Sequence, residues 1–290
     1  MNRKIIILKK NNKDVFFENI YGIEKYYWCS NKNILLRIII KFNLPFLSIL
    51  FGDWKKNIKK YDCIILFDNG YNKNIAKYIR KKNPEIKIIF WYWNALKEYN
   101  NMVIEDKNID EIWTYNRFDA ETYNLKYNSQ FYHRIDRKKF DDKIENDIIF
   151  MGRNKGRKEK IEEVYEKLKE KQLKCNFIII KNEKDYINYN DYITKVLKSK
   201  CIFDYSYTDY NGLSLRPLEA LFYRKKLITN NKDIINYDFY RPNNIFVLGI
   251  DDMDKIKEFI DSPYEEIDEE IINYYEFNSW LERFFEEEKC

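Results

Sequence analysis

A carboxylate lies on the apolar face of a predicted short helix within residues 211–231. The segment NGLSLRPLEALFYRKKLITNN begins with a turn at Asn211 and Gly212 and ends in an apolar run. At about 100° per residue, Glu219 falls near Leu215, on the face that should meet the core. Two partners for this carboxylate stay open: a bound ligand, or an ion pair with a nearby arginine or lysine.

The surroundings of Glu219 favour a ligand. The helix lies between predicted strands at 201–207 and 226–230, so its first turn stands at a carboxyl end of the sheet, where ligands bind. Free amides and the helix dipole bind phosphate at such a position, and Pro217 fits a first turn because its missing N–H costs nothing there. We expect the turn to hold a diphosphate and Glu219 to accept hydrogen bonds from a ribose diol.

A basic cluster follows a second strand and glycine turn. In DIIFMGRNKGRKEKIEEVYEKL, four basic residues crowd the start of a predicted helix at 156–171: Arg153, Lys155, Arg157 and Lys158. Positive charges are unfavourable at the positive end of a helix dipole, and a bound anion would offset this. The cluster predicts an anion site after Gly152, with Arg153 as the first candidate ligand and Lys158 as the second. A solvated run of charge is the alternative.

Strands alternating with helices must position these groups. Continuous apolar runs predict strands at 4–8, 63–67, 86–93, 111–115, 129–133, 147–152, 175–180, 201–207, 226–230 and 245–250. Such runs between helical patterns indicate parallel sheets buried on both faces. The polar stretch 135–146 is interpreted as a linker, and acidic helices at 252–262 and 264–289 end the chain. The prediction is an α/β protein of two Rossmann-like domains facing each other across a cleft.

Strand ends in the first half offer groups for an acceptor. Asp68, with Asn69 beside it, could act as a general base on a hydroxyl, or it could form a turn or an N-cap. Trp91, Trp93 and Asn94 stand at the end of the next strand. Alternating residues point to opposite sides of a strand, so these rings either stack on a sugar or pack in the core.

The chain's lone histidine and its cysteines bear on catalysis and metal binding. His133 is predicted to end the last strand of the first half, where proton transfer and a structural role are both open. One histidine and five dispersed cysteines do not form a zinc set. The run IDDMDK has the look of the DxD motif of GT-A glycosyltransferases, but its aspartates are interpreted as helix caps. We expect no metal and no cofactor.

The segment NGLSLRPLEALFYRKKLITNNKDIINYDFY resembles the donor site of GT-B glycosyltransferases, particularly small bacterial enzymes of the family 1/4 type that build lipopolysaccharide and capsule. The resemblance covers most of 147–260 and, more weakly, the first half. It implies a donor site made of these residues: Gly152, Arg153, Lys158, Asn211, Gly212, Leu213, Ser214, Arg216 and Glu219. The commonest retaining pattern has a second acid upstream, for which Asp204 and Asp209 are the candidates, so retaining and inverting chemistry stay open.

The resemblance implies a metal-independent hexosyltransferase. It would move a sugar from a nucleotide-sugar donor, expected to be UDP-linked, to a growing surface glycan such as lipopolysaccharide or capsule. The acceptor domain is expected at 1–140 and the donor domain at 147–274, with a helix at 275–290 packing back on the first domain. A non-catalytic nucleotide- or glycan-binding protein of the same fold is the alternative.

The composition of the chain indicates which classes of partner, such as nucleic acid or membrane, it is suited to bind. The net charge is +5, but 47 acidic residues are interspersed along the chain, so the basic stripe of a nucleic-acid binder is missing. The unpaired cysteines and the short apolar core of the first residues predict a cytoplasmic protein. The apolar stretch 33–52 is interrupted by Arg37, Lys41 and Pro45, which disfavours a membrane span. It is either a core helix and loop or a surface that touches the anionic inner membrane, where a lipid-linked glycan acceptor would lie.

Overall fold

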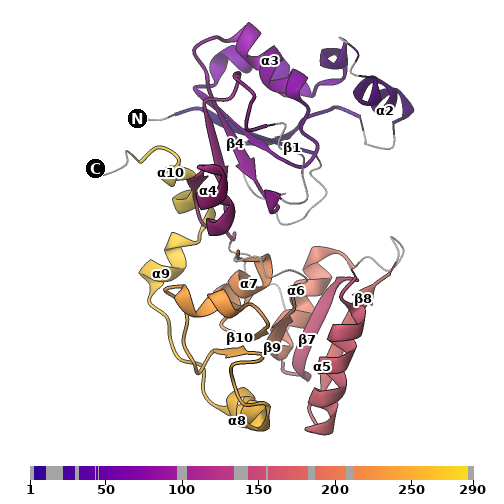
Figure 1. The fold of residues 1–290 in the computed structure, drawn as a ribbon, viewed down its shortest axis with the longest axis vertical. Coiled ribbons are helices and arrows are strands. Elements are labelled where there is room, and N and C mark those ends of the chain that lie inside the picture. Colours follow the sequence, from indigo (N-terminus) through magenta and orange to yellow (C-terminus); the bar gives the residue numbers. More distant parts are fainter. Residues whose placement is uncertain are drawn as a thin grey trace. The chain divides into compact units, whose positions relative to one another are not determined.

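The computed structural model describes residues 3–10, 22–29, 33–42, 44, 46–96, 103–133, 143–154, 156–181, 187–206 and 212–286. Contacts divide the chain into two units, Met1–Asn128 (unit 1) and Ser129–Cys290 (unit 2). Each unit is built on a parallel sheet with helices packed beside it (Figure 1). The α/β class with two parallel sheets, predicted from the apolar runs, is therefore confirmed.

The sheet of unit 1 has the strand order β2-β1-β3-β4-β5-β6. Its strands are β1 (Ile5–Lys9), β2 (Ile23–Lys25), β3 (Cys63–Phe67), β4 (Lys87–Tyr92), β5 (Glu111–Thr114) and β6 (Lys126–Tyr127). The chain goes from β1 to β2 on one side and resumes with β3 on the other. The topological switch point therefore lies between β1 and β3, and Lys10 and Asp68 follow these strands there. Ligands bind at such points in open α/β sheets.

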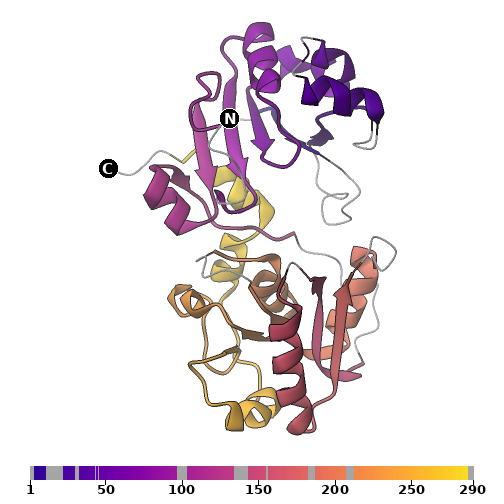
Figure 2. The same ribbon diagram turned by 45° about the vertical axis from the view of Figure 1, so that its right-hand side comes forward.

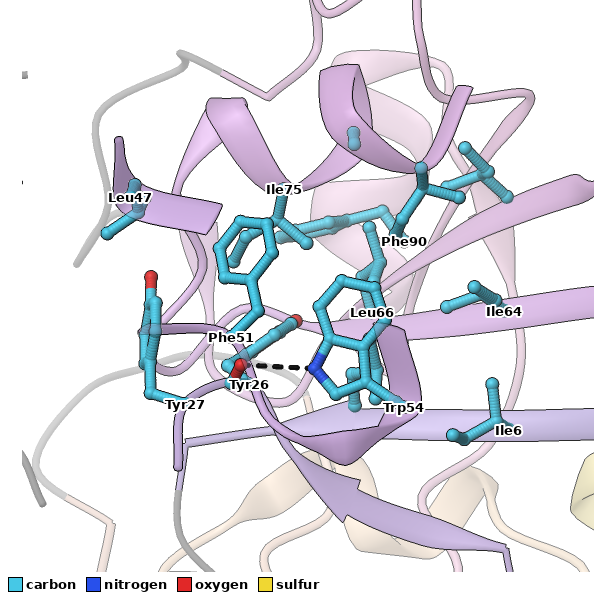
Figure 3. Packing of buried hydrophobic residues seen from close by; sticks show 14 of the residues in the cluster. Ile6, Tyr26, Tyr27, Leu47, Phe51, Trp54, Ile64, Leu66, Ile75 and Phe90 are labelled. Carbon is cyan, nitrogen blue, oxygen red and sulfur yellow. Dashed lines mark hydrogen bonds between the residues drawn. The ribbon is translucent and has the colours of Figure 1, made fainter. Parts of the chain in front are cut away.

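Aromatic side chains fill much of the core of unit 1. Helices α2 (Ile34–Lys41), α3 (Lys73–Lys82) and α4 (Arg117–Tyr123) accompany the sheet, with the 3-10 helices η1 (Leu47–Leu50), η2 (Asp53–Lys56) and η3 (Ile58–Lys60). The buried Trp54 donates its indole N–H to the carbonyl of Tyr26 at 3.1 Å, and its ring lies 5.1 Å from that of Phe51 (Figure 3). This hydrogen bond lets a polar aromatic group occupy the core without loss of its partner.

The sheet of unit 2 has the strand order β11-β10-β9-β7-β8. Its strands are β7 (Asn146–Arg153), β8 (Cys175–Ile180), β9 (Ser199–Asp204), β10 (Lys226–Thr229) and β11 (Ile245–Val247). After β7 the chain forms β8 on one side, and β9 then returns to the other side of β7. The switch point of unit 2 therefore lies between the carboxyl ends of β7 and β9, where Gly152 and Asp204 stand.

Helices cover both faces of the unit 2 sheet (Figure 2). They are α5 (Lys158–Glu170), α6 (Tyr189–Leu197), α7 (Leu215–Tyr223), α8 (Ile256–Asp261), α9 (Glu269–Tyr274) and α10 (Phe277–Arg283), with 3-10 helices η7 (Lys232–Asn236) and η8 (Met253–Lys255). Phe150 and Phe203 belong to a core cluster with Ile161 of α5, while Ile149 and Ile202, which alternate with them, are equally buried. Burial on both faces explains why these strands are continuous apolar runs.

The strand predicted at 129–133 is not formed. In this segment Tyr132 makes an isolated bridge with Glu276, and its N–H donates to the carbonyl of Tyr275 at 2.8 Å. Phe131 packs on Trp280 of α10, with ring centroids 4.3 Å apart. The apolar residues of 129–133 are thus buried by a helix rather than by a neighbouring strand. The helical region predicted at 264–289 is broken into α9 and α10 at Tyr275, and most of the predicted linker lies outside the described residues.

Two of the cysteines lie in central strands. Cys63 in β3 and Cys201 in β9 are 1% and 0% exposed, and the cysteines that the structure describes are free thiols. Burial raises the pKa of Cys63 to about 12 and also raises that of Cys201. Among the helices of the described ranges, none combines the length and the apolarity that a bilayer crossing requires.

Candidate functional site

Two arginine side chains meet at the switch point of unit 2. Arg216 in the first turn of α7 and Arg157 just before α5 both lie over the ring of Phe150, with guanidinium carbons 5.3 and 5.7 Å from its centroid. A Cβ on Gly152 would stand 2.8 Å from Nη2 of Arg216 and 3.0 Å from Nη2 of Arg157. Glycine at this position of β7 therefore leaves the space in which the two cations meet. We name Arg157 and Arg216 the arginine pair.

Arg216 is fixed by groups at the ends of β7 and β9. Its Nη1 donates to Oδ1 of Asp204 at 3.0 Å, and its Nη2 donates to the carbonyl of Met151 at 2.6 Å. Its buried Nε has no hydrogen-bond partner among the described residues. Burial disfavours the charge of Arg216, but Asp204 and other neighbours outweigh it, so its pKa is raised. Asp204, one candidate for the second acid of the retaining pattern, is thus engaged in an ion pair, and Asp209 lies outside the described residues.

The surroundings of Arg157 favour its positive charge less than those of Arg216 do. Its Nη1 donates to the carbonyl of Tyr205, and its Nε donates to the carbonyl of Arg153 at 3.4 Å. Burial and, next, the nearby charge of Arg216 lower its pKa. Asp204 and Glu219 both favour the charge of Arg216, whereas for Arg157 the favourable charge comes from Asp204. Planar guanidinium groups match the oxygens of phosphates and carboxylates, so the arrangement can bind an anion.

The turn before α7 lies at the same end of the sheet. Leu213 is buried, and the carbonyl of Gly212 accepts from the side chain of Asn231 at 3.4 Å. Ser214 occupies the N-cap position of α7, but its hydroxyl donates to Asp204 at 3.2 Å, and no described side chain caps the helix. The first amides of α7 thus lack a side-chain acceptor within the described part of the chain. Asn211, predicted to be part of this turn, lies outside that part.

Tyrosine hydroxyls occupy both oxygens of Glu219. The carboxylate is 2% exposed and accepts from Tyr189 at 2.9 Å and from Tyr192 at 2.6 Å. The Tyr189 hydroxyl also lies 2.7 Å from that of Tyr132, which donates to Tyr223 at 3.2 Å. Burial raises the pKa of Glu219, and the hydrogen bonds from tyrosine oppose this. The sequence suggested a bound ligand or an ion pair with arginine or lysine as the partner of Glu219, and it did not indicate these tyrosines. Ribose binding by Glu219 stays a prediction.

The side chains of Arg153 and Lys158, the first and second candidate anion ligands predicted from the sequence, are not part of the arginine pair. Arg153 is exposed at the end of β7, and Nζ of Lys158 lies 3.3 Å from Glu162 one turn along α5. Arg157 belongs to the same basic cluster but was not ranked. The sequence does contain a feature that points to Arg157. Phe150 and Gly152 are two residues apart in β7, so they share one face of the strand, and the ring of Phe150 lies beside the glycine where a guanidinium group can stack on it.

Asp68, Asn69 and Asn94 come together at the carboxyl ends of β3 and β4. Asp68 accepts from the backbone N–H of Asn69 at 2.6 Å, and from the backbone and side-chain N–H groups of Asn94 at 3.1 and 3.0 Å. Burial raises the pKa of Asp68 to about 6, although these hydrogen bonds oppose the shift. The same contacts suit a turn anchor and a carboxylate that titrates near neutral pH, so both alternatives for Asp68 stay open.

The remaining candidates are aromatic or basic side chains. Trp91 is fully buried in β4, which corresponds to the core-packing alternative, and a fully buried ring has no face for a sugar. Trp93 is partly exposed and stacks on Phe67 at 5.6 Å. His133 is partly exposed in unit 2 and ends no strand; burial lowers its pKa, and Glu276 opposes the shift.

The acidic run at 250–255 is a cap. The side chain of Asp252 accepts from the N–H of Asp254 at 3.0 Å at the start of η8, which confirms the interpretation as a helix start. Within the described residues, no group of three or more histidine, cysteine, aspartate or glutamate side chains is arranged to hold a metal ion.

Comparison with known proteins gives weak likenesses. Neither a protein-family model nor a curated protein matches the sequence. The chain is similar to a crystal structure of an α1,3-fucosyltransferase, with a TM-score of 0.46 and 12% identity, over 98% of this chain and 82% of that chain. An α1,3-fucosyltransferase with GDP gives a TM-score of 0.43 and 10% identity over the same shares. Likeness at this level transfers neither a substrate nor an activity to the chain.

Proposed function

We propose that the protein is a glycosyltransferase with a GT-B arrangement and that unit 2 binds a nucleotide-sugar donor. The arginine pair over Phe150 carries this proposal. It lies at the β7–β9 switch point, the position at which open parallel sheets bind ligands. Its two planar guanidinium groups, together with the first amides of α7, suit a diphosphate.

The arginine pair would act on the leaving group. When the bond between the anomeric carbon and the phosphate oxygen breaks, negative charge develops on the nucleoside diphosphate. Fixed cations and amides stabilise that charge without having to reorganise. Arg157 and Arg216 would take the role that a metal ion has in other transferases, so the proposed reaction is metal-independent.

Asp68 in unit 1 is the proposed base for the acceptor hydroxyl. A carboxylate with a pKa of about 6 is largely ionised at neutral pH and remains basic enough to accept a proton. Transfer activity should then rise as the pH passes through about 6. The finer assignments are a UDP-linked hexose as donor, a growing surface glycan as acceptor and a cytoplasmic location, and they rest on the sequence resemblance.

Thermal unfolding with UDP, GDP, CMP, ADP and ATP tests the donor site. A ligand that binds only the folded state raises the midpoint, by the equivalent of about 2.7 kcal/mol at a hundredfold excess over its Kd. We expect one diphosphate to raise the midpoint of the native protein. Arg157→Ala should remove this shift, whereas Arg153→Ala, which removes the same charge from an exposed side chain, should retain it.

Three results would change the proposal. No shift with any nucleotide would remove the donor site. Equal losses in the Arg157 and Arg153 variants would make the effect one of general charge. Binding without sugar transfer, when nucleotide sugars are screened with glycan acceptors, would favour a non-catalytic binding protein, for which the fully hydrogen-bonded Asp68 would serve as a turn anchor.

A further inference from the structure

Helix α2 is apolar on its outer face as well as on its inner face. Leu36 and Ile39 are 1% and 3% exposed and face the core. At about 100° per residue, the opposite side carries two isoleucines and two cations: Ile34, Arg37, Ile38 and Lys41. Ile34 is 72% exposed and Ile38 is 43% exposed. A helix that is apolar on both sides is normally covered on both sides.

Exposed apolar side chains continue around this helix. Among the described residues, 8 of the 13 large apolar side chains that are exposed lie between Trp28 and Ile49. Six of them form what we name the α2 surface: Ile34, Leu35, Ile38, Phe42, Phe46 and Ile49. Single exposed apolar residues are common on proteins, but a cluster of this kind marks an interaction surface.

The charged residues of the segment that carries the α2 surface have one sign. Acidic residues make up 47 of the 290 residues of the chain, yet none occurs from Lys25 to Gly52. The nearest acid after this stretch, Asp53, is paired with Lys56 at 2.6 Å. A segment whose exposed side chains are apolar and whose charged residues are all basic complements an anionic lipid headgroup region over an acyl layer. A second copy of this chain would bring its own cations against these.

A pocket of about 530 Å³ adjoins the α2 surface at the switch point of unit 1. Helix α2 contributes Ile34, Arg37 and Lys41 to its lining, and the segments that follow β1 and β3 contribute Lys10 and Tyr71. The described lining contains three cations and no acidic side chain. It therefore suits a phosphate group whose apolar part lies beside the isoleucines of α2.

We propose that the α2 surface docks unit 1 on a bilayer that contains anionic phospholipid. The apolar side chains of the α2 surface enter the boundary between headgroups and acyl chains. Arg37, Lys41 and Lys10 contact lipid phosphates, one of which occupies the pocket. This contact requires no nucleotide and no sugar transfer, so it can be tested whether or not unit 2 binds a donor.

Vesicle flotation of the full chain tests the docking. We expect binding to phosphatidylcholine vesicles that contain phosphatidylglycerol, and little binding to phosphatidylcholine alone. A basic residue near an anionic surface contributes on the order of 1 kcal/mol, so Arg37→Glu with Lys41→Glu should weaken binding by about thirtyfold or more. Ile34→Ser with Ile38→Ser should weaken it by at least about tenfold.

Matched variants separate docking from general effects. Lys59→Glu with Lys60→Glu makes the same charge change on exposed residues of η3, and Ile235→Ser with Ile250→Ser removes exposed isoleucines of unit 2. Both should bind vesicles as the native protein does. Absence of native binding, equal binding to neutral vesicles, or equal losses in the controls would overturn the inference. So would a native dimer in free solution that Ile34→Ser with Ile38→Ser dissociates, because a second copy would then cover the surface.

Discussion

At the scale of single residues, Gly152 decides whether the arginine pair can form. An alanine Cβ would come within 2.8 Å of one guanidinium and 3.0 Å of the other. We expect Gly152→Ala to displace both side chains and to weaken binding of a nucleoside diphosphate by at least about tenfold, the effect of losing one charge-assisted hydrogen bond. Titration calorimetry measures this.

Gly249→Ala is the control for Gly152→Ala. Gly249 has a φ of +80°, so an alanine there is strained, but its Cβ would meet only the end of a lysine side chain at 4.0 Å. It should lower stability by about 1 kcal/mol and leave nucleotide affinity unchanged. Unchanged affinity in Gly152→Ala as well would separate the arginine pair from ligand binding.

Asp68 makes a prediction about stability and pH. Its pKa is about 6 in the folded protein, against an ordinary value of 3.8, so the folded state binds the proton more tightly. This contribution to stability is present below pH 3.8 and is lost as the pH rises to about 6. At about 1.4 kcal/mol per pKa unit the loss is about 3 kcal/mol.

Urea unfolding between pH 3 and 7 of the native protein and of Asp68→Asn measures this loss. The variant cannot titrate at this position, so the difference in stability between the two proteins should shift in favour of the variant as the pH rises. A shift in the other direction would mean that the pKa of Asp68 is lowered by its three N–H donors rather than raised by burial.

The hydroxyls around Glu219 can be tested one at a time. Tyr192→Phe removes the donor to one carboxylate oxygen in a buried site, which should cost about 1–3 kcal/mol. Losing this bond raises the pKa of Glu219 further, so the destabilisation should be larger at neutral than at acid pH. Tyr165→Phe, on α5 with its ring beside Phe177, should change the stability by less than about 0.5 kcal/mol. Equal losses in the two variants, measured in urea, would contradict the account.

The sequence indicates the backbone of the candidate site better than its contacts. Gly152, Ser214 and Arg216 follow from strand, turn and helix patterns that span a few residues each. Both hydrogen-bond partners of Glu219 come from another helix, α6, and the proximity of Arg157 to Arg216 depends on how the segments after β7 and β9 meet at Phe150. Patterns of a few neighbouring residues do not indicate which side chains from distant segments come into contact.

At the scale of elements, continuous apolar runs made the strands predictable, both in the fully buried β3 and in the partly buried edge strand β8. The runs at 63–67 and 175–180 correspond to β3 and β8 residue for residue. The segment 129–133, SQFYH, has only Phe131 and Tyr132 as large aromatic residues, and Phe131 is covered by Trp280 of α10. An apolar run shows that a segment is buried, and it does not show which element buries it.

Helix α10 should contribute strongly to the stability of unit 2. Trp280 is fully buried, and its ring lies 4.3 Å from Phe131 and 4.7 Å from Phe284. We expect Trp280→Ala to lower the free energy of unfolding by about 3–5 kcal/mol. Trp28→Ala removes a ring that is 64% exposed and should have a small effect in the same denaturant experiment. A small effect of both would mean that α10 is loosely held.

At the scale of the whole molecule, the units have separate cores. One contains Trp54 and Phe51, and the other contains Phe150 and Phe203. A nucleoside diphosphate bound at the arginine pair should slow amide exchange at the end of β7 and the start of α7, while β3 and β4 keep their rates. Exchange with and without nucleotide, read by mass spectrometry, measures this. If nucleotide slowed amide exchange only in unit 1, the nucleotide site would have to be assigned to unit 1 instead of unit 2.

The buried cysteines allow the opening of each unit to be followed by chemical labelling. A thiol reacts as the thiolate, and Cys63 and Cys201 are both inaccessible and protonated in the folded sheets. Each can be alkylated only after its own central strand opens to solvent. The rates at which a maleimide labels β3 and β9 would therefore rank the two units by how often they open, without an engineered probe.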